Sequence, residues 1–190
     1  MAPMPSFAAV AGPWQTFYVL VGTAAATLVG LMFVAVTFGS SIVRRETSET
    51  ARSFIDPTFT HFVQVLFVAC LVVIPTMRPR LLGALLLTVS ALRFADLVRV
   101  HRHMRRAQKV HHDIELSDWV TGIVVPIVCY LLLGAAGLGF VRGHAGAFTT
   151  LAIATVAILM LGVFGAWELM LWMALTRAVG ARAIGEHPRD

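Results

Sequence analysis

The chain has 190 residues, of which 58% are hydrophobic and 13% are charged, and its formal net charge is +5. This composition excludes an ordinary soluble globular protein and indicates an integral membrane protein, with residues 1–190 forming a single transmembrane helical domain. Cys70 and Cys129 each lie in an apolar run without CxxC spacing, which argues against a disulfide framework and against a zinc ribbon.

Five segments are predicted to be transmembrane helices, because a helix needs about 20 mainly apolar residues to cross a bilayer. They cover residues 14–43, 57–77, 81–100, 119–141 and 147–175. Asp56 followed by Pro57 is typical of a helix N-cap and first helical residue, so the second helix is predicted to begin there. The predicted fold is an all-α membrane protein with five transmembrane helices.

The first predicted helix carries a face of small and hydroxylated residues, most of them at heptad spacing. This face comprises Thr16, Thr23, Thr27, Gly30, Thr37 and Ser41. Small residues let helices approach closely in lipid, and hydroxyls can bond across the interface, so the face is interpreted first as a packing seam. The alternative is that several copies of the helix surround a pore that these hydroxyls line. Both interpretations are compatible with a homo-oligomer.

The third predicted helix places two charged residues inside the membrane. Only twelve uncharged residues, Leu81 to Leu92, precede Arg93, and this stretch is too short to cross a bilayer core. The helix must therefore continue to about Val100, which places Arg93 and Asp96 within the inner leaflet. Their spacing of three puts both on one helical face, where each partly neutralises the other.

Other ionisable and polar residues are predicted to lie at a similar depth in the second and fifth helices. The predicted polar cluster comprises His61, Gln64, Arg93, Asp96 and Glu168. Ionisable residues inside a membrane are costly and often functional, so the cluster is a candidate path for ions or protons. The alternative is a structural network that fixes helix packing. Asp96 and Glu168 compete for Arg93, and both pairings remain open.

A basic segment follows the third predicted helix. Arginines recur at a spacing of three from Arg93 to Arg105, with Asp96 in the one missing position, which invites comparison with a voltage sensor. The intervening residues, however, become polar after Val100. The pattern therefore favours a helix that leaves the bilayer and meets anionic lipid headgroups. His111 and Glu115 have a spacing that could hold a metal, but a solvated loop is the preferred interpretation, and no metal site is predicted.

The distribution of basic residues predicts the orientation of the chain. Twelve lysines and arginines follow the first and fifth predicted helices or end and follow the third, whereas only Arg78, Arg80 and Arg142 lie on the other side. Because such residues accumulate in cytoplasmic loops, the N-terminus is predicted to be outside and the C-terminus cytoplasmic. The same asymmetry explains the high pI, so a nucleic-acid partner is not expected.

No catalytic or cofactor-binding motif occurs in the chain, so neither an enzyme nor a cofactor is predicted. The stretches "GLMFVAVTFGSSIV" and "GAWELMLWMAL" resemble segments of small, uncharacterised bacterial inner-membrane proteins. The resemblance implies a multi-pass protein of the bacterial inner membrane and transfers no site residues.

We therefore predict a homo-oligomeric membrane protein that mediates ion or small-solute permeation. The alternative is a structural or regulatory interaction protein that does not transport.

Overall fold

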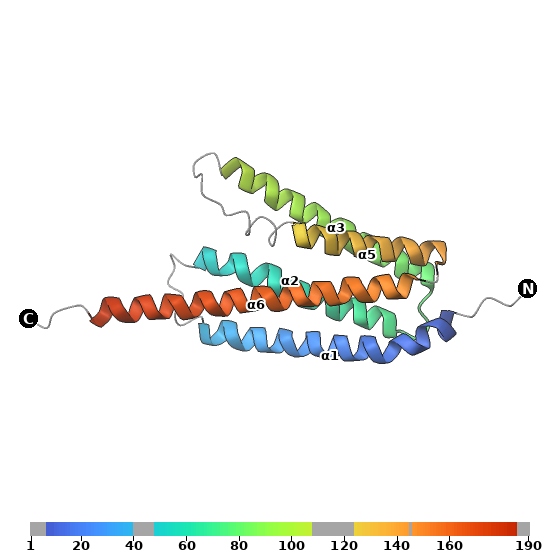
Figure 1. Cartoon of the computed structure of the whole chain (residues 1–190), viewed down its shortest axis with the longest axis horizontal. Helices are drawn as coiled ribbons and strands as arrows, with labels where there is room; N and C mark the ends of the chain where they lie inside the picture. The colour runs from blue at the N-terminus through green and yellow to red at the C-terminus, as the bar shows by residue number, and fades with distance from the viewer. Residues whose placement is uncertain (1–6, 40–47, 108–123, 145, 186–190) are drawn as a thin grey trace, which may run out of the picture.

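The computed structural model describes residues 7–39, 48–107, 124–144 and 146–185. Over these ranges the chain forms helices joined by short turns, with no strand (Figure 1). The helices are α1 (Phe7–Gly39), α2 (Ser48–Val73), α3 (Pro79–Ala107), α5 (Val125–Arg142) and α6 (Ala147–Gly185). The all-helical prediction is thereby confirmed.

Four of these helices are long and apolar enough to span a membrane within the described ranges: α1, α3, α5 and α6. The apolar part of α2, Pro57–Val73, is shorter. The prediction of a multi-pass membrane protein is thus supported by four candidate spans, with α2 as a shorter fifth apolar helix. A stretch of this length can still cross if the bilayer thins or flanking side chains reach the interface.

The start predicted for the second helix is wrong. α2 begins at Ser48 and runs through Pro57, which lies inside the helix instead of at its first position. A proline inside a helix loses the bond from its own N–H, and its ring crowds the carbonyl four residues earlier. A helix can nevertheless continue past it, often with a kink. α3 and α6 also extend beyond their predicted ends, whereas the predicted start of the fourth helix at Trp119 lies outside the described residues.

The turn between α5 and α6 is short and closed by backbone hydrogen bonds. Gly143 has φ 72°, a left-handed conformation that suits glycine at a helix C-terminus. The N–H of Gly143 bonds the Phe140 carbonyl at 3.3 Å, and the N–H of His144 bonds the Gly139 carbonyl at 2.9 Å. These bonds satisfy carbonyls that the end of α5 would otherwise leave unpaired.

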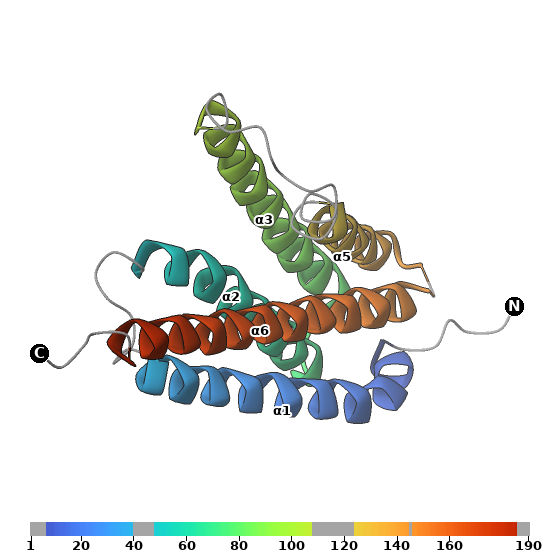
Figure 2. The ribbon, with the colours of Figure 1, turned by 60° about the vertical axis from the view of Figure 1, so that its left-hand side comes forward.

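The helices form two groups. α1, α2 and α6 pack together, α3 packs along α5, and α5 joins the groups by packing on α6. α2 and α3 make few contacts, and α3 leans away from α2 and α6 toward its own C-terminal end (Figures 1 and 2). The groups therefore separate at the end of the bundle where α3 and α6 terminate.

The distribution of buried residues explains this separation. α3 contributes Leu82 and Leu86, both from its first half, to the main core. A second, smaller core of Met32, Phe62 and Leu169 joins α1, α2 and α6 and contains no residue of α3. In the part of the chain whose side chains the structure describes, α3 thus joins the core through its first half.

α3 and α5 cross at very close range in their well-packed portion. An ideal Cβ at Gly83 would lie 2.5 Å from the Gly137 carbonyl oxygen, and one at Gly137 would lie 2.9 Å from the Gly83 carbonyl oxygen. Further along the pair, the Ser90 hydroxyl donates to the Tyr130 carbonyl at 2.7 Å. Glycine contacts and hydroxyl bonds of this kind are typical of helix association in lipid.

Candidate functional site

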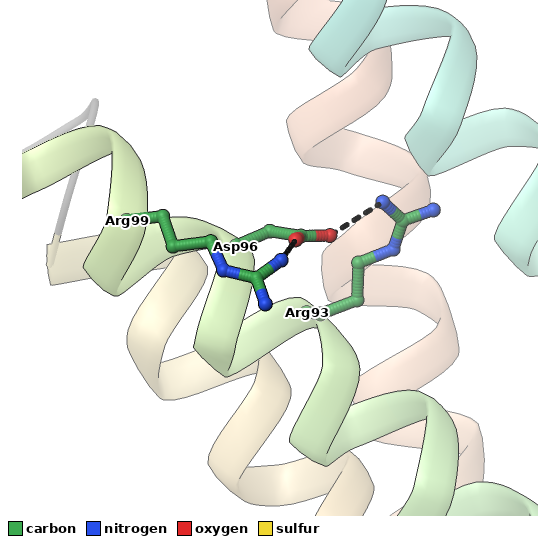
Figure 3. A network of polar contacts seen from close by, with 3 residues as sticks. All are labelled: Arg93, Asp96 and Arg99. Carbon is green, nitrogen blue, oxygen red and sulfur yellow. Dashed lines mark hydrogen bonds and ion pairs between the residues drawn. The ribbon is translucent and has the colours of Figure 1, made fainter. Parts of the chain in front are cut away.

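α3 carries a chain of three charged side chains (Figure 3). Arg93 Nη1 lies 3.9 Å from Asp96 Oδ2, and Arg99 Nη1 donates a hydrogen bond to Asp96 Oδ1 at 3.4 Å. Asp96 therefore lies between two arginines, one turn apart on each side. Between the two candidate partners of Arg93, the structure places Asp96 beside it, whereas Glu168 makes no ion pair with Arg93.

Arg93 is the most enclosed of these three residues. Its side chain is 32% exposed, compared with 53% for Asp96 and 77% for Arg99. Figure 3 shows its guanidinium directed away from α3, toward the side on which α2 and α6 lie. At 3.9 Å the contact with Asp96 is an ion pair but is too long for a hydrogen bond. The guanidinium thus keeps its donors available within the described part of the chain.

α2 contributes His61 and Gln64, which lie one turn apart. The His61 ring stacks on Tyr130 of α5, with centroids 6.4 Å apart and an interplanar angle of 16°. Gln64 is 3% exposed. His61 Nδ1 and both polar atoms of the Gln64 amide are buried and have no hydrogen-bond partner among the described residues. A buried polar group without a partner costs about 1–3 kcal/mol, so it indicates a bound water, ion or ligand, or a site of function.

Tyr130 of α5 lies between the two helices. Its ring stacks on His61 of α2, and its carbonyl accepts a hydrogen bond from Ser90 of α3, one turn before Arg93. We call His61, Gln64, Arg93 and Asp96 the α2–α3 polar cluster. Its groups include one carboxylate, which two arginines already engage.

Two residues of this neighbourhood were not predicted from the sequence. Tyr130 supplies the ring beneath His61, and Ser90 bonds its backbone carbonyl. The available signal was that the chain has only two tyrosines, Tyr18 and Tyr130, and that both lie within predicted membrane helices. A tyrosine buried in a membrane span brings a hydroxyl that needs a partner.

Glu168 is separate from the cluster. Glu168 is exposed on α6. It follows Gly165 by three positions, and Gly165 packs against the Thr58 side chain of α2. Thr58 precedes His61 on α2, so Glu168 lies nearer the end where α6 terminates. Four of the five predicted cluster residues are thus located on α2 and α3, and the fifth lies apart on α6.

The hydroxylated face of α1 does not pack inside the chain. Thr16, Thr23, Thr27, Gly30 and Thr37 are all exposed, and Ser41 lies outside the described residues. Three of the threonine hydroxyls donate to the carbonyl four residues earlier, at 2.8–2.9 Å. These bonds satisfy the hydroxyls within α1 itself, so the helix needs no partner on this face. Packing of the face against another copy of the chain and lining of a pore by the face therefore both remain predictions.

The contact between α1 and α2 uses another part of α1. A Cβ at Gly22 would lie 2.9 Å from the Ala69 Cβ, whereas one at Gly30 would meet nothing within 4 Å. An open, mainly apolar groove of about 520 Å³ runs between α1 and α2 beside Gly22 and contains no residue of the polar cluster.

No group of three or more metal-ligating side chains occurs in the described ranges, and His111 and Glu115 lie outside them. Comparisons with protein-family models, curated proteins and solved structures gave no match. The resemblance to small bacterial inner-membrane proteins therefore stays a prediction.

The pairing of Arg93 can be measured with two double-mutant cycles. We expect Arg93→Gln and Asp96→Asn to show a coupling energy of about 0.5 kcal/mol, as for other partly exposed pairs one turn apart. Arg93→Gln and Glu168→Gln should be additive within about 0.3–0.5 kcal/mol, because the two side chains do not touch. Unfolding of the purified protein by a denaturing detergent measures both. A larger coupling to Glu168 than to Asp96 would contradict the pairing.

Proposed function

We propose that this protein mediates the permeation of an ion or small solute across a bacterial inner membrane, along a path that passes the α2–α3 polar cluster. The observation that carries the proposal is the buried Gln64 amide, which has no hydrogen-bond partner among the described residues. It lies one turn from His61, whose ring stacks on Tyr130 of α5. Polar groups arranged in this way offer a small solute hydrogen bonds at a depth where lipid offers none.

The geometry argues against a purely structural role for the charged residues. A network that fixes packing connects different helices, but among the described residues Arg93, Asp96 and Arg99 pair only along α3. Structural networks also satisfy their buried members, and Gln64 is not satisfied by the described residues. The divergence of α3 from α2 lies at the same end of the bundle, so a solute would approach from there.

The remaining elements of the proposal come from sequence patterns. We place the N-terminus outside and the C-terminus in the cytoplasm, following the arginine distribution. The exposed hydroxylated face of α1 would join copies into a homo-oligomer, and the basic end of α3 would meet anionic lipid headgroups. The protein needs no enzymatic activity or cofactor for this role.

Flux measurements on purified protein in liposomes test the proposal. We expect the wild type to release or admit ions or small solutes well above protein-free vesicles. Arg93→Gln should lower the rate at least about tenfold, since it removes a charged hydrogen-bond donor from the path. Arg99→Gln is the matched control, because it removes the same charge from the more exposed neighbour of Asp96 and should preserve most of the rate.

Two outcomes would contradict permeation. Wild-type vesicles that are as tight as empty ones toward small cations, anions and neutral solutes would favour the non-transporting alternative. Equal loss of rate in Arg93→Gln and Arg99→Gln would show that the path does not pass Arg93.

A further inference from the structure

We propose that the groove between α1 and α2 binds one acyl chain of an anionic phospholipid, whose phosphate headgroup is held by Arg78 in the turn between α2 and α3. The site lies at the end of the bundle opposite to the basic end of α3. It does not depend on permeation, so it can be tested whether or not the protein conducts.

The groove has the dimensions of a single acyl chain. Its volume is about 520 Å³, and its walls are mainly apolar. On α2 and the turn after it the lining residues run from Leu66 to Pro75, a length of about 14 Å at 1.5 Å per residue. One leaflet contributes about 15 Å to the hydrocarbon core of a bilayer. The groove therefore matches the part of a lipid that lies in one leaflet.

The groove is open to the surrounding lipid. Thr23, Ala26 and Cys70 line it, and all three residues are exposed. The Thr23 hydroxyl donates to the Val19 carbonyl at 2.8 Å, so a hydrocarbon chain can lie against Thr23 without leaving a donor unpaired. An acyl chain can thus enter from the side, with no rearrangement of α1 or α2.

Arg78 lies at the mouth of the groove. Ile74 and Pro75 line this end, and the N–H of Met77 donates to the Ile74 carbonyl at 3.2 Å, which closes a tight turn. The first and last Cα atoms of such a turn lie within about 7 Å, and consecutive Cα atoms are about 3.8 Å apart. Arg78 follows Met77 directly and is exposed, so its long side chain can reach a headgroup above the groove.

The arginines at this end have no carboxylate partner within the chain. α1, α3 and α6 begin at this end, and α2 and α5 end there (Figure 1). The basic residues of these segments are Arg78, Arg80 and Arg142. Asp and Glu are absent from residues 1–45, 57–95 and 119–167, which contain all the segments at this end. An anionic group beside these arginines therefore belongs to another molecule.

The same absence argues against a second copy of the chain as the occupant. Copies of a membrane protein share one orientation, so a neighbouring copy brings the same acid-free end to this surface. Its α1 in the groove would add positive charge near Arg78 and no carboxylate. An anionic phospholipid supplies both parts that the site needs, a hydrocarbon chain and a phosphate that accepts bidentate hydrogen bonds from arginine.

The headgroup determines which lipid is preferred. Lipid tails are about as apolar as leucine side chains, so the exchange of one acyl chain for another in the groove changes the free energy little. The groove therefore sets the position of the lipid. One arginine near the membrane surface favours an anionic over a zwitterionic headgroup by about fivefold.

The test is photo-crosslinking of the full-length protein in detergent micelles with a phosphatidylglycerol that carries a diazirine in one acyl chain. Mass spectrometry of the digested protein locates the adducts, which we expect in residues 18–26 and 66–75. Unlabelled phosphatidylglycerol should suppress these adducts at a concentration at least about fivefold lower than phosphatidylcholine with the same acyl chains. Absence of groove adducts, or equal suppression by the two lipids, would overturn the proposal.

Two pairs of variants assign the site. Arg78→Gln should reduce the preference for phosphatidylglycerol to within about twofold, whereas Arg99→Gln, at the opposite end of α3, should retain it. Ala26→Phe should remove most of the groove adducts, because the ring fills the groove. Ala84→Phe, the same change at an exposed position of α3, should preserve them. Arg78 and Ala26 are exposed, so neither variant disturbs the core.

Two further outcomes would contradict the site. An unchanged lipid preference in Arg78→Gln would show that Arg78 does not hold the headgroup. Groove adducts that form only when the protein is diluted would identify a second copy of the chain as the occupant.

Discussion

Gly83→Ala is expected to lower the free energy of unfolding by about 3 kcal/mol, at the upper end of the usual cost of overpacking. The new Cβ would lie 2.5 Å from the Gly137 carbonyl oxygen and 3.0 Å from the Val141 backbone nitrogen. Both obstacles are backbone atoms, so a change of rotamer cannot relieve the clash and α3 must move away from α5.

Gly30→Ala is the matched control, because the same chemical change on α1 meets nothing within 4 Å. It should be neutral or stabilise the protein by up to about 1 kcal/mol, since alanine is the better helix former. Unfolding by a denaturing detergent compares the two variants directly. If Gly83→Ala were as stable as Gly30→Ala, the close crossing of α3 and α5 would be incorrect.

Phe62→Ala is expected to have an effect of similar size, about 3 kcal/mol, because it empties a well-packed aromatic position. Phe62 is 1% exposed and its ring lies against Gly162, where an added Cβ would be 2.7 Å from Cε1. It also belongs to the smaller core that joins α1, α2 and α6. His61 is the adjacent residue, so the packing of Phe62 fixes the rotation of α2 that presents His61 to Tyr130.

A size exchange makes this prediction specific. Gly162→Leu alone should also destabilise the protein, whereas the double variant Phe62→Ala, Gly162→Leu should recover part of the loss, because the new side chain fills the space that the ring vacates. Phe67→Ala, at an exposed position of the same helix, should change stability by no more than about 0.5 kcal/mol. Strictly additive losses in the double variant would contradict the contact between Phe62 and Gly162.

The class of the protein could be predicted from the sequence because it depends on local quantities. The length of each apolar run determines whether a helix can cross a bilayer, and the runs of α1, α3, α5 and α6 are long enough. The same reasoning placed Arg93 at membrane depth, since the preceding apolar run ends too early. Helix ends were predicted less well, because polar residues extend α2 and α6 beyond the apolar runs.

The Arg93–Asp96 pair was also within reach of the sequence. Residues three apart on a helix are neighbours whatever the tertiary structure, so this contact needs only the helix itself. Pairing of Arg93 with Glu168 would have required a particular rotation and height of α6 relative to α3. No local pattern encodes those two quantities, which is why the choice between the carboxylates stayed open.

Only the tertiary structure decided which side chains surround the cluster. Tyr130 stacks on His61, and Ser90 bonds its carbonyl, because α5 crosses α3 through glycines that let the two backbones meet. The hydroxylated face of α1 faces outward because Gly22, and not Gly30, contacts α2. The physical reason is common to both: hydrophobicity determines how deep a helix lies in a membrane, whereas its rotation depends on which small residues fit against its neighbours.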